Sequence, residues 1–527
     1  MTALYNTAEI REIEAAFATT HSGASLMLRA GTAVMTLAID LIAKHKLKKS
    51  VLILAGPGDN GGDAWVAARK LQQKKINVTV LALGERKKES PVAKKSHADY
   101  VRANGTVLKA ASVQGFEARL NAEFGLIIDG IFGIGLSRKP FGEFARAIEF
   151  ANSLREKYGT PILAIDVPSG LSADTGSAFG EVIHATTTLT FLGAKPGLYT
   201  ADGTDCCGEI VIDSLGLELP PTSGALLSEA SCAALIPQRR NNSHKGTYGN
   251  VGIIGGSDGM VGAAIIAARA ALHMGPGKVY VGLVTKQAMP FDSINPEIMI
   301  RSAADLIKEK HITIFAIGMG IGKNAVARLM MKKAVNSLKP ILVDADALRW
   351  VRLSSHKIKS KAGVALKAKK AQNTSLSLGF KMNNILTPHP GEAAQLLGIS
   401  TKDVQQDRIA AGLTIARRAD AIVVLKGAGT IIATPPGDDR PGQYFINTTG
   451  NPGMASGGMG DALSGMIAAF MAQGLCSLDA AKLGVFLHGA AADAACHHGM
   501  GPNGLTASEV IFEARSLLNS DLADHHD

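Results

Sequence analysis

The sequence has few aromatic residues and few cysteines. Phe, Trp and Tyr make up 5% of its 527 residues, which argues against an antibody-like sandwich and against a surface on which nucleic-acid bases stack. The five cysteines show no CxxC or Cys/His ligand spacing. We therefore predict neither a disulfide framework nor a zinc site, and we expect a reducing compartment.

Export and membrane signals are also lacking. The first residues are acidic rather than basic, unlike the start of a signal peptide. The apolar stretch from Ala24 to Ala43 is interrupted by Arg29 and Asp40, which argues against a membrane-spanning helix. We expect a cytoplasmic protein with no membrane partner.

The chain is basic, with 55 Lys and Arg against 45 Asp and Glu, a net charge of +10. Much of this charge comes from lysines in the segment 351–384, which has no acidic residue. No nucleic-acid motif accompanies it, so we interpret it as a solvated excursion that can steer an anionic ligand, and we predict no nucleic-acid partner. A nucleic-acid-binding scaffold remains an alternative that rests on charge alone.

Short β-branched runs alternate with segments of helical period along the chain. This pattern is typical of α/β proteins in which helices cover parallel sheets. We predict strands at Ser50–Ala55, Asn77–Leu83, Phe124–Asp129, Pro161–Asp166, Thr187–Leu192, Asn250–Gly255, Lys278–Val284, Thr313–Gly318, Pro340–Asp344, Ala421–Lys426, Thr430–Thr434 and Gln443–Asn447. The pattern lapses in a Pro- and Ser-rich stretch, which predicts two domains, 1–228 and 229–527.

Three predicted strands of the first domain end in carboxylates and glycines. One leads into the loop 56–63, GPGDNGGD, and a helix expected over Ala64–Gln72, and the others end at Asp129 and Asp166. Ligands bind at the carboxyl ends of parallel strands, and glycine loops let backbone N–H groups approach phosphate. The loops predict one pocket. They contain neither the GxGxxG of dehydrogenases nor a Walker A lysine.

The run GPGDNGGDAWVAARKL, followed by DGIFGIGL, AIDVPSGLSADTG and FLGAKPGL, resembles the NAD(P)H-hydrate epimerase domain. The resemblance implies a Rossmann-like three-layer αβα fold, Asp166 as the catalytic carboxylate, and a potassium ion held by Asn60, Asp129 and Ser169. It also implies which residues line the hydrated dinucleotide: Asp59, Asn60, Gly61, Gly62, Asp63, Gly133, Ile134, Gly135, Leu136, Ser137, Arg138 and Lys139. Asp59 and Ala64 stand where the family commonly has Asn and Gly.

In the second domain, Gly457–Gly460 precedes Asp461 and a helix expected over Ala462–Phe470. N–H groups at such a helix start can stabilise charge on a transferring phosphoryl group while the carboxylate takes a proton from a hydroxyl. A merely helix-stabilising first-turn acid is the alternative, but it does not account for the glycines. A small-residue helix over Gly262–Ala271 is expected to pack closely behind the strand Asn250–Gly255 and the glycine loop that follows it.

HKGTYG, GGS, PHPGE, LKG and NPGMASGGMGD occur together and resemble the ribokinase-like, ADP- or ATP-dependent NAD(P)H-hydrate dehydratases. The resemblance implies that the hydrated dinucleotide contacts Ala263, Gly320, His389 and Asp461. It implies that ADP, accompanied by Mg²⁺, contacts Lys426, Gly427, Ala428, Gly429, Thr430 and Gly460. Met459 replaces the Thr that is common before the final Gly-Asp, and Pro276 stands in a loop usually written Gly-Ala-Gly.

Together the resemblances imply a bifunctional enzyme that repairs hydrated NADH and NADPH. The first domain would interconvert the R and S hydrates at C6, and the second would dehydrate the S form with ADP, giving NAD(P)H, AMP and phosphate. The alternative is a ribokinase-like kinase of a vitamin precursor with a non-catalytic nucleotide-binding first domain, because Asp461 suits any alcohol acceptor. We also expect a homo-oligomer.

Overall fold

The computed structural model describes residues 1–20, 25–85, 90–110, 124–286, 290–354, 383–438 and 440–519. Most of the lysine-rich segment 351–384 lies outside the described residues. The chain forms two compact units, Ala3–Thr222 and Met1–Thr2 with Ser223–Asp527. The predicted division between residues 228 and 229 lies a few residues later in the chain, at the start of the helix Glu229–Ala233.

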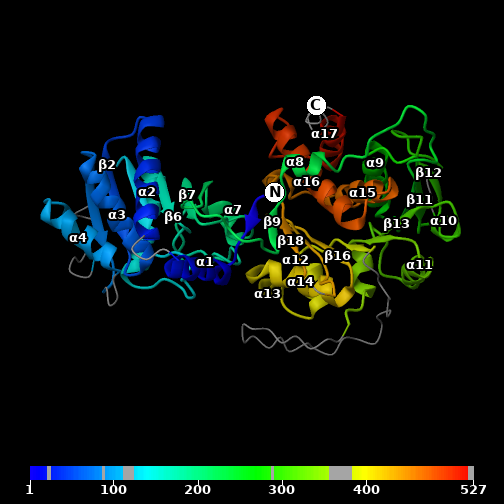
Figure 1. Cartoon of the computed structure of the whole chain (residues 1–527). Helices are drawn as coiled ribbons and strands as arrows, with labels where there is room; N and C mark the ends of the chain where they lie inside the picture. Colours follow the sequence, from blue (N-terminus) through cyan, green and yellow to red (C-terminus); the bar gives the residue numbers. More distant parts are fainter. Residues whose placement is uncertain are drawn as a thin grey trace. The chain divides into compact units, whose positions relative to one another are not determined.

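The N-terminal unit alternates strands and helices (Figure 1). Its elements are β1 (Ala3–Leu4), α1 (Thr7–Thr20), α2 (Leu26–Lys44), β2 (Ser50–Ala55), α3 (Asp59–Gln73), β3 (Asn77–Ala82), α4 (Pro91–Arg102), β4 (Thr106–Lys109), β5 (Leu126–Gly130), α6 (Glu143–Tyr158), β6 (Ile162–Ile165), β7 (Thr187–Phe191), η2 (Pro196–Leu198), α7 (Gly203–Cys206) and β8 (Glu209–Asp213).

Its sheet has the order β4-β3-β2-β5-β6-β7-β8, and the described pairs in it are parallel. Side chains alternate between two cores. Val51 and Ile53 of β2 belong to the core that includes α2 and α3, whereas Leu52 and Leu54 belong to the core that includes α6. This arrangement confirms the three-layer αβα expectation. The strand order reverses between β2 and β5, which is where such sheets bind ligands.

Helix α2 is long and apolar enough to cross a membrane by length and composition. Within this unit, however, only one of its faces is buried. Its face formed by Ala30, Val34 and Ala38 is buried, and it packs on α3. The approach is close at Gly31, where an added Cβ would lie 2.4 Å from Cβ of Val66.

The C-terminal unit has the same alternation. Its elements are β9 (Gly224–Leu226), α8 (Glu229–Ala233), β10 (Asn250–Gly255), α9 (Val261–His273), β11 (Lys278–Leu283), β12 (Met299–Ser302), α10 (Ala303–Leu306), β13 (Ile314–Ile317), α11 (Ala325–Asn336), β14 (Ile341–Val343), η3 (Ala345–Trp350), β15 (Ile385–Leu386), α12 (Pro390–Leu397), α13 (Thr401–Gln406), α14 (Arg408–Ala419), β16 (Ile422–Leu425), β17 (Ile431–Ala433), β18 (Tyr444–Ile446), η4 (Pro452–Met454), α15 (Met459–Ala472), α16 (Ser477–His497) and α17 (Ala507–Asn519).

Within this unit the sheet runs β9-β18-β17-β16-β15-β14-β13-β10-β11-β12. From β16 to β12 the strands are parallel, and the order reverses between β10 and β13. The α/β class is therefore confirmed in both units. The sheet is not wholly parallel, because β17 is antiparallel to β16 and β18. The link 426–430 is too short for the crossover that a parallel pair requires.

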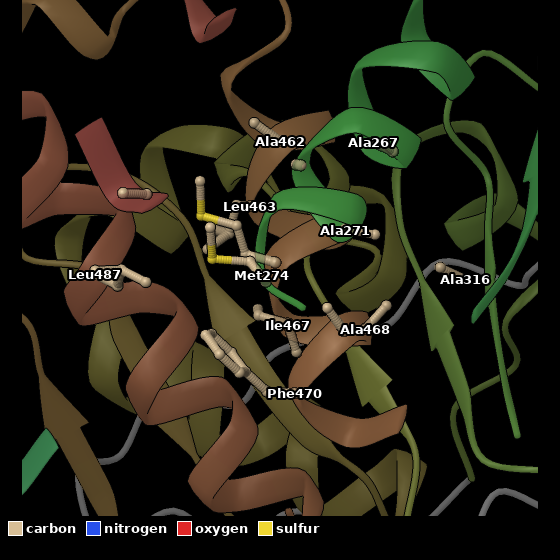
Figure 2. Close-up of a cluster of buried hydrophobic side chains, with 14 of the residues drawn as sticks. Ala267, Ala271, Met274, Ala316, Ala462, Leu463, Ile467, Ala468, Phe470 and Leu487 are labelled. Carbon is tan, nitrogen blue, oxygen red and sulfur yellow. The ribbon is translucent and has the colours of Figure 1, made fainter. Parts of the chain in front are cut away.

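Helices α9, α15 and α16 share one large core (Figure 2). Phe470 and Ile467 of α15 and Leu487 of α16 are buried in it. The expected packing of the small-residue helix behind β10 and its glycine loop is confirmed, since a Cβ added to Gly255 or Gly256 would lie 3.4 Å from Cβ of Ala264. Helix α9 also packs closely on α15, because a Cβ added to Gly465 would lie 2.1 Å from the carbonyl oxygen of Ala267. This packing fixes the start of α15 above the strand ends.

Candidate active sites

In the N-terminal unit, the loops after β2 and β5 meet backbone to backbone. A Cβ added to Gly56 would lie 1.9 Å from the carbonyl oxygen of Ile131, and one added to Gly61 would lie 1.9 Å from that of Gly56. Only glycine fits such an approach. Ala64 also fits, because the residue facing its Cβ is Gly130.

Helix α3 begins at Asp59, earlier than the expected Ala64. The segment from Asp59 to Asp63 is therefore the start of a helix rather than a free loop, and the N–H of Gly62 already donates to the carbonyl oxygen of Gly58. Glycines do not stop a helix whose first residues are fixed by tertiary contacts. Asp59 is exposed in the first turn, where the helix dipole favours a carboxylate.

A group of three buried polar residues lies next to these loops: Asn60, Asp129 and Ser169. Ser169 donates from Oγ to Asp129 Oδ1 at 2.7 Å and from its N–H to Oδ2 at 2.8 Å. Asn60 Nδ2 donates to the carbonyl oxygen of Phe132 at 2.9 Å. Burial raises the pKa of Asp129 to about 6, although the bonds from Ser169 and Ile131 oppose the shift.

Asp166 follows β6 and has a left-handed backbone (φ +65°). Its Oδ1 accepts from Lys195 Nζ at 2.6 Å and, at 3.3 Å, from Thr190 Oγ1. Its Oδ2 faces the loop after β5, since a Cβ added to Gly133 would lie 3.4 Å from Asp166 Oδ2 and 3.3 Å from Asn60 Oδ1. Asp166 Oδ2 and Asn60 Oδ1 therefore face the same point in space, next to Gly133.

Further carboxylates surround this point. Burial raises the pKa of Asp63, and Asp166, Asp59 and Glu14 add to the increase. Burial also raises the pKa of Glu14, with Asp166 next in effect and Lys195 opposing. Sequence reasoning missed Glu14, which stands in a helix without a motif. It also missed Lys195, although the motif FLGAKPGL contains it.

The loop 133–139 is partly exposed. The N–H of Leu136 donates to the carbonyl oxygen of Gly133, which forms a turn. Arg138 lies over the ring of Phe141 at 5.4 Å. The aliphatic part of Lys139 lies against Gly180. The two basic side chains of this loop thus have surface positions, whereas Gly133 is nearest to Asp166.

In the C-terminal unit, Asp461 lies in the first turn of α15, which begins at Met459 rather than at the expected Ala462. Gly458 caps the helix with a left-handed backbone (φ +91°). The Met459 side chain is buried in the core, which explains how a residue other than Thr fits there. Gly460 and Asp461 therefore stand where a helix has free N–H groups that favour an anion.

Lys426, after β16, and Asp344, after β14, form an ion pair with 2.7 Å between Nζ and Oδ1. Ser464 of α15 donates to Asp344 Oδ2 at 2.8 Å. A Cβ added to Gly460 would lie 3.1 Å from Lys426 Nζ. The ammonium therefore lies between a buried carboxylate and the start of α15.

Three carboxylates interact electrostatically with the ammonium of Lys426, namely those of Asp344, Glu392 and Asp461. Burial raises the pKa of Asp461 to about 7, with Asp344 and Glu392 adding to the increase and Lys426 opposing it. Burial raises the pKa of Glu392 to about 7 as well, and Lys426 again opposes. A carboxylate poised near neutral pH is suited to general acid–base chemistry.

His389 caps α12. Its Nδ1 accepts from the N–H of Gly391 at 3.0 Å, while Glu392 Oε2 accepts from the N–H of His389 at 2.8 Å. Burial lowers the pKa of His389, and Lys426 adds to the decrease. The imidazole thus has a structural role beside Glu392, with Nε2 3.3 Å from Glu392 Oε1.

Ala263 and Gly320 lie side by side at the reversal of the strand order. A Cβ added to Gly320 would lie 3.1 Å from Cβ of Ala263 and 2.5 Å from the carbonyl oxygen of Met260. Gly320 has a left-handed backbone (φ +62°) and accepts from the N–H of Ser257. Glycine is therefore required at this position.

The loop from Lys426 to Thr430 links two antiparallel strands. Thr430 Oγ1 donates to the carbonyl oxygen of Gly427 at 2.9 Å. Gly427 lies against Arg408, whose Nη2 donates to the carbonyl oxygen of Lys426 at 3.2 Å. Arg408 is buried and holds the backbone of this loop by that hydrogen bond. No sequence signal indicated this role of Arg408.

Other charged and polar groups of this site also escaped sequence reasoning. Asp344 was expected only as the end of a strand, and Ser464 carries no motif. His488 of α16 is buried, and burial with the nearby charge of Lys426 lowers its pKa to about 4. Asp344 and His488 interact electrostatically with Lys426, and Ser464 bonds Asp344.

Two family models match this chain. One, described as YjeF-related protein N-terminus, matches residues 23–197, and the other, described as NAD(P)H-hydrate dehydratase, matches residues 251–512. A solved structure of the ADP/ATP-dependent NAD(P)H-hydrate dehydratase from Bacillus subtilis, co-crystallized with ATP/Mg²⁺, is 28% identical, with a TM-score of 0.45 over 56% of this chain and 97% of that chain.

Full-length relatives match both units. The bifunctional NAD(P)H-hydrate repair enzyme Nnr of Coxiella burnetii is 35% identical over 98% of this chain and 100% of its own length. The enzyme of the same name from Escherichia coli is 35% identical over 95% of this chain and 91% of its own. The resemblance inferred from the motifs is thereby confirmed, and the chain belongs to the family of bifunctional NAD(P)H-hydrate repair enzymes.

Proposed function

We propose that this chain repairs hydrated NADH and NADPH in two steps. Residues 1–228 interconvert the R and S hydrates at C6. Residues 229–527 then dehydrate the S form with ADP. The proposal is supported by family membership and by two separate carboxylate sites, each at the strand-end edge of its own sheet.

The observation that carries the dehydratase assignment is the position of Asp461. It stands in the first turn of α15 with a pKa of about 7, near Lys426. Asp461 would take the proton of the C6 hydroxyl as that oxygen attacks the terminal phosphorus of ADP and AMP leaves. Loss of phosphate from C6 and of a proton from C5 then restores the double bond. Phosphorylation converts a poor leaving group into a good one.

Asp166 is the proposed acid–base of the epimerase site. Its Oδ2 faces the point shared with Asn60 Oδ1 beside Gly133, which is where we expect C6 of the hydrate. The remaining residues inferred for this site, 59–63 and 133–139, flank that point and would bind the rest of the dinucleotide. The carboxylate would accept the proton of the C6 hydroxyl as the C6–N1 bond breaks and C6 becomes a carbonyl carbon. It would return that proton when N1 closes the ring on the other face of the carbonyl.

Potassium fits the polar group below this point. Asp129 is buried, and the groups of Ser169 and Ile131 that donate hydrogen bonds to it are neutral. A monovalent cation bound by Asn60, Asp129 and Ser169 would offset the buried charge with hard oxygen ligands, as such cations prefer. When bound, it would supply positive charge beside the substrate.

Magnesium would accompany ADP in the other site. The described residues include no group of three or more His, Cys, Asp or Glu side chains that could hold a metal. Phosphate oxygens would therefore supply ligands, as is usual for this ion. Lys426 to Thr430 and Gly460 would contact the nucleotide, while Ala263, Gly320 and His389 would contact the hydrate. We place the enzyme in the cytoplasm, as a homo-oligomer.

The test is recovery of dihydronicotinamide absorbance from mixed R and S NADH hydrate with ADP and magnesium. Wild type should restore all of it, Asp461→Ala none, and Asp166→Ala only the S fraction. Each variant leaves the other unit intact, so chromatography of the hydrates gives an internal control. If wild type instead accumulates a stable phosphate ester, the vitamin-precursor kinase becomes the better assignment.

A further inference from the structure

Lys195 is a buried cation that the proposed roles leave unused. Its side chain is 1% exposed. Its ammonium donates to Asp166 Oδ1 and to the carbonyl oxygen of Phe191, each at 2.6 Å, and to Thr190 Oγ1 at 2.9 Å. Three acceptors match the three N–H donors of an ammonium. A buried charge of this kind is costly unless it is paired, so the pairing with Asp166 determines where the ammonium lies.

The two carboxylate oxygens of Asp166 have different surroundings. Oδ1 accepts from Lys195, from Thr190 Oγ1 and from the N–H of Phe191. Oδ2 is directed toward Gly133. The left-handed backbone at Asp166 turns its side chain in this direction, and its N–H is held by the carbonyl oxygen of Leu189 at 2.7 Å. One oxygen is thus anchored while the other faces the expected substrate.

The surroundings of Asp166 are acidic. Glu14 comes from α1, and Asp59 and Asp63 come from α3. Arg11 of α1 also acts on Glu14, but with a smaller effect than Lys195. Several carboxylates in one partly buried space oppose one another's ionisation. A cation within the cluster offsets this repulsion.

We propose that Lys195 is a positioning residue of the epimerase site, whose positive charge pairs with Asp166 Oδ1 and thereby holds Oδ2 directed at C6 of the hydrate. The inference rests on the proposed function. It adds that the Lys195–Asp166 pair, rather than Asp166 alone, is the unit required for proton transfer.

The experiment compares wild type, Lys195→Met, Lys195→Arg and Thr190→Val as full-length enzymes, with R-to-S interconversion followed by chromatography across pH. Lys195→Met removes the charge and nearly preserves the side-chain volume. Thr190→Val removes the hydroxyl that bonds Asp166 and Lys195 but leaves the ammonium, so it is the matched control for the charge.

We expect Lys195→Met to lower kcat by about 100-fold or more while KM changes little, because proton transfer by a positioned group contributes on the order of 100- to 10,000-fold. We also expect the acid limb of its pH profile to move up by about one pH unit or more, because an ion pair within ~4–6 Å shifts a carboxylate by roughly that much. Thr190→Val should move the limb less, because it removes one hydrogen bond to the carboxylate and no charge. Lys195→Arg, which keeps the positive charge, should have its acid limb at the wild-type pH.

Three results would overturn the inference: Lys195→Met with wild-type kcat, a lower kcat with an unmoved acid limb, or the same limb shift in Thr190→Val. If Lys195→Met does not unfold cooperatively, Lys195→Arg decides, since a limb at the wild-type pH supports the charge role and a displaced limb contradicts it. Failure of wild type to interconvert the hydrates would instead reject the proposed function.

Discussion

The ammonium of Lys426 lies 2.7 Å from Asp344 Oδ1, and Ser464 occupies the other carboxylate oxygen at 2.8 Å. This relationship joins the ends of β14 and β16 to helix α15. The Asp344 side chain is 1% exposed, so these partners take the place of the water that it has lost. Since Asp461 is in the first turn of the same helix, the pair supports the proposed catalytic carboxylate structurally as well as electrostatically.

Lys426→Met should destabilise the C-terminal unit by about 3–5 kcal/mol, because it leaves Asp344 charged and buried without its cation. Denaturant unfolding measures this loss. Adding Asp344→Asn should recover part of it, since the double variant buries no uncompensated charge. Additive losses in the double variant would show that the two residues act independently.

Dehydration of the S hydrate should accelerate as pH rises through about 7, the pKa to which burial raises Asp461. The proton acceptor must be deprotonated, so activity is lost below that pH and retained above it. The measurement is kcat against pH at saturating ADP. Glu392 has a similarly raised pKa, so Glu392→Gln is the control, and an acid limb that disappears in this variant would assign the titration to Glu392.

The predicted strands are all present, with ends that differ by one or two residues. The strands that sequence reasoning missed include β4, β8 and β12, which lie at sheet edges and are partly exposed. Their side chains are too polar for the apolar runs by which central strands are recognised. Strand β17 was predicted, but its antiparallel direction was not, since periodicity indicates a strand without giving its direction.

The motif residues in the sites were predictable because glycines and carboxylates cluster locally in the sequence. Their partners were not. Lys195 reaches Asp166 across 29 positions, and Lys426 reaches Asp344 across 82. Such pairs are created by the order of strands in a sheet, which no local pattern specifies.

Gly61→Ala should abolish epimerisation and destabilise the N-terminal unit by at least ~1–3 kcal/mol, the usual cost of overpacking. Its Cβ would lie 1.9 Å from the carbonyl oxygen of Gly56, and backbone cannot easily move away. Gly58→Ala is the matched control, because nothing lies within 4 Å of its added Cβ. Both are compared by hydrate chromatography and thermal unfolding, with S-hydrate dehydration as the internal reference. Equal losses in the two variants would contradict the role given to close backbone approach.

Potassium should raise the unfolding temperature of the N-terminal unit. A ligand that binds only the folded state stabilises it by about 2.7 kcal/mol at 100 times its dissociation constant. Thermal unfolding in potassium chloride is compared with choline chloride at equal ionic strength, so that general screening cancels. Asp129→Asn should lose the difference, because it removes the buried charge that we propose the cation offsets. Asp461→Asn, in the other unit, should keep it. If Asp129→Asn retains the full effect, potassium binds elsewhere, and the bonds from Ser169 must be regarded as the means by which the fold accommodates Asp129.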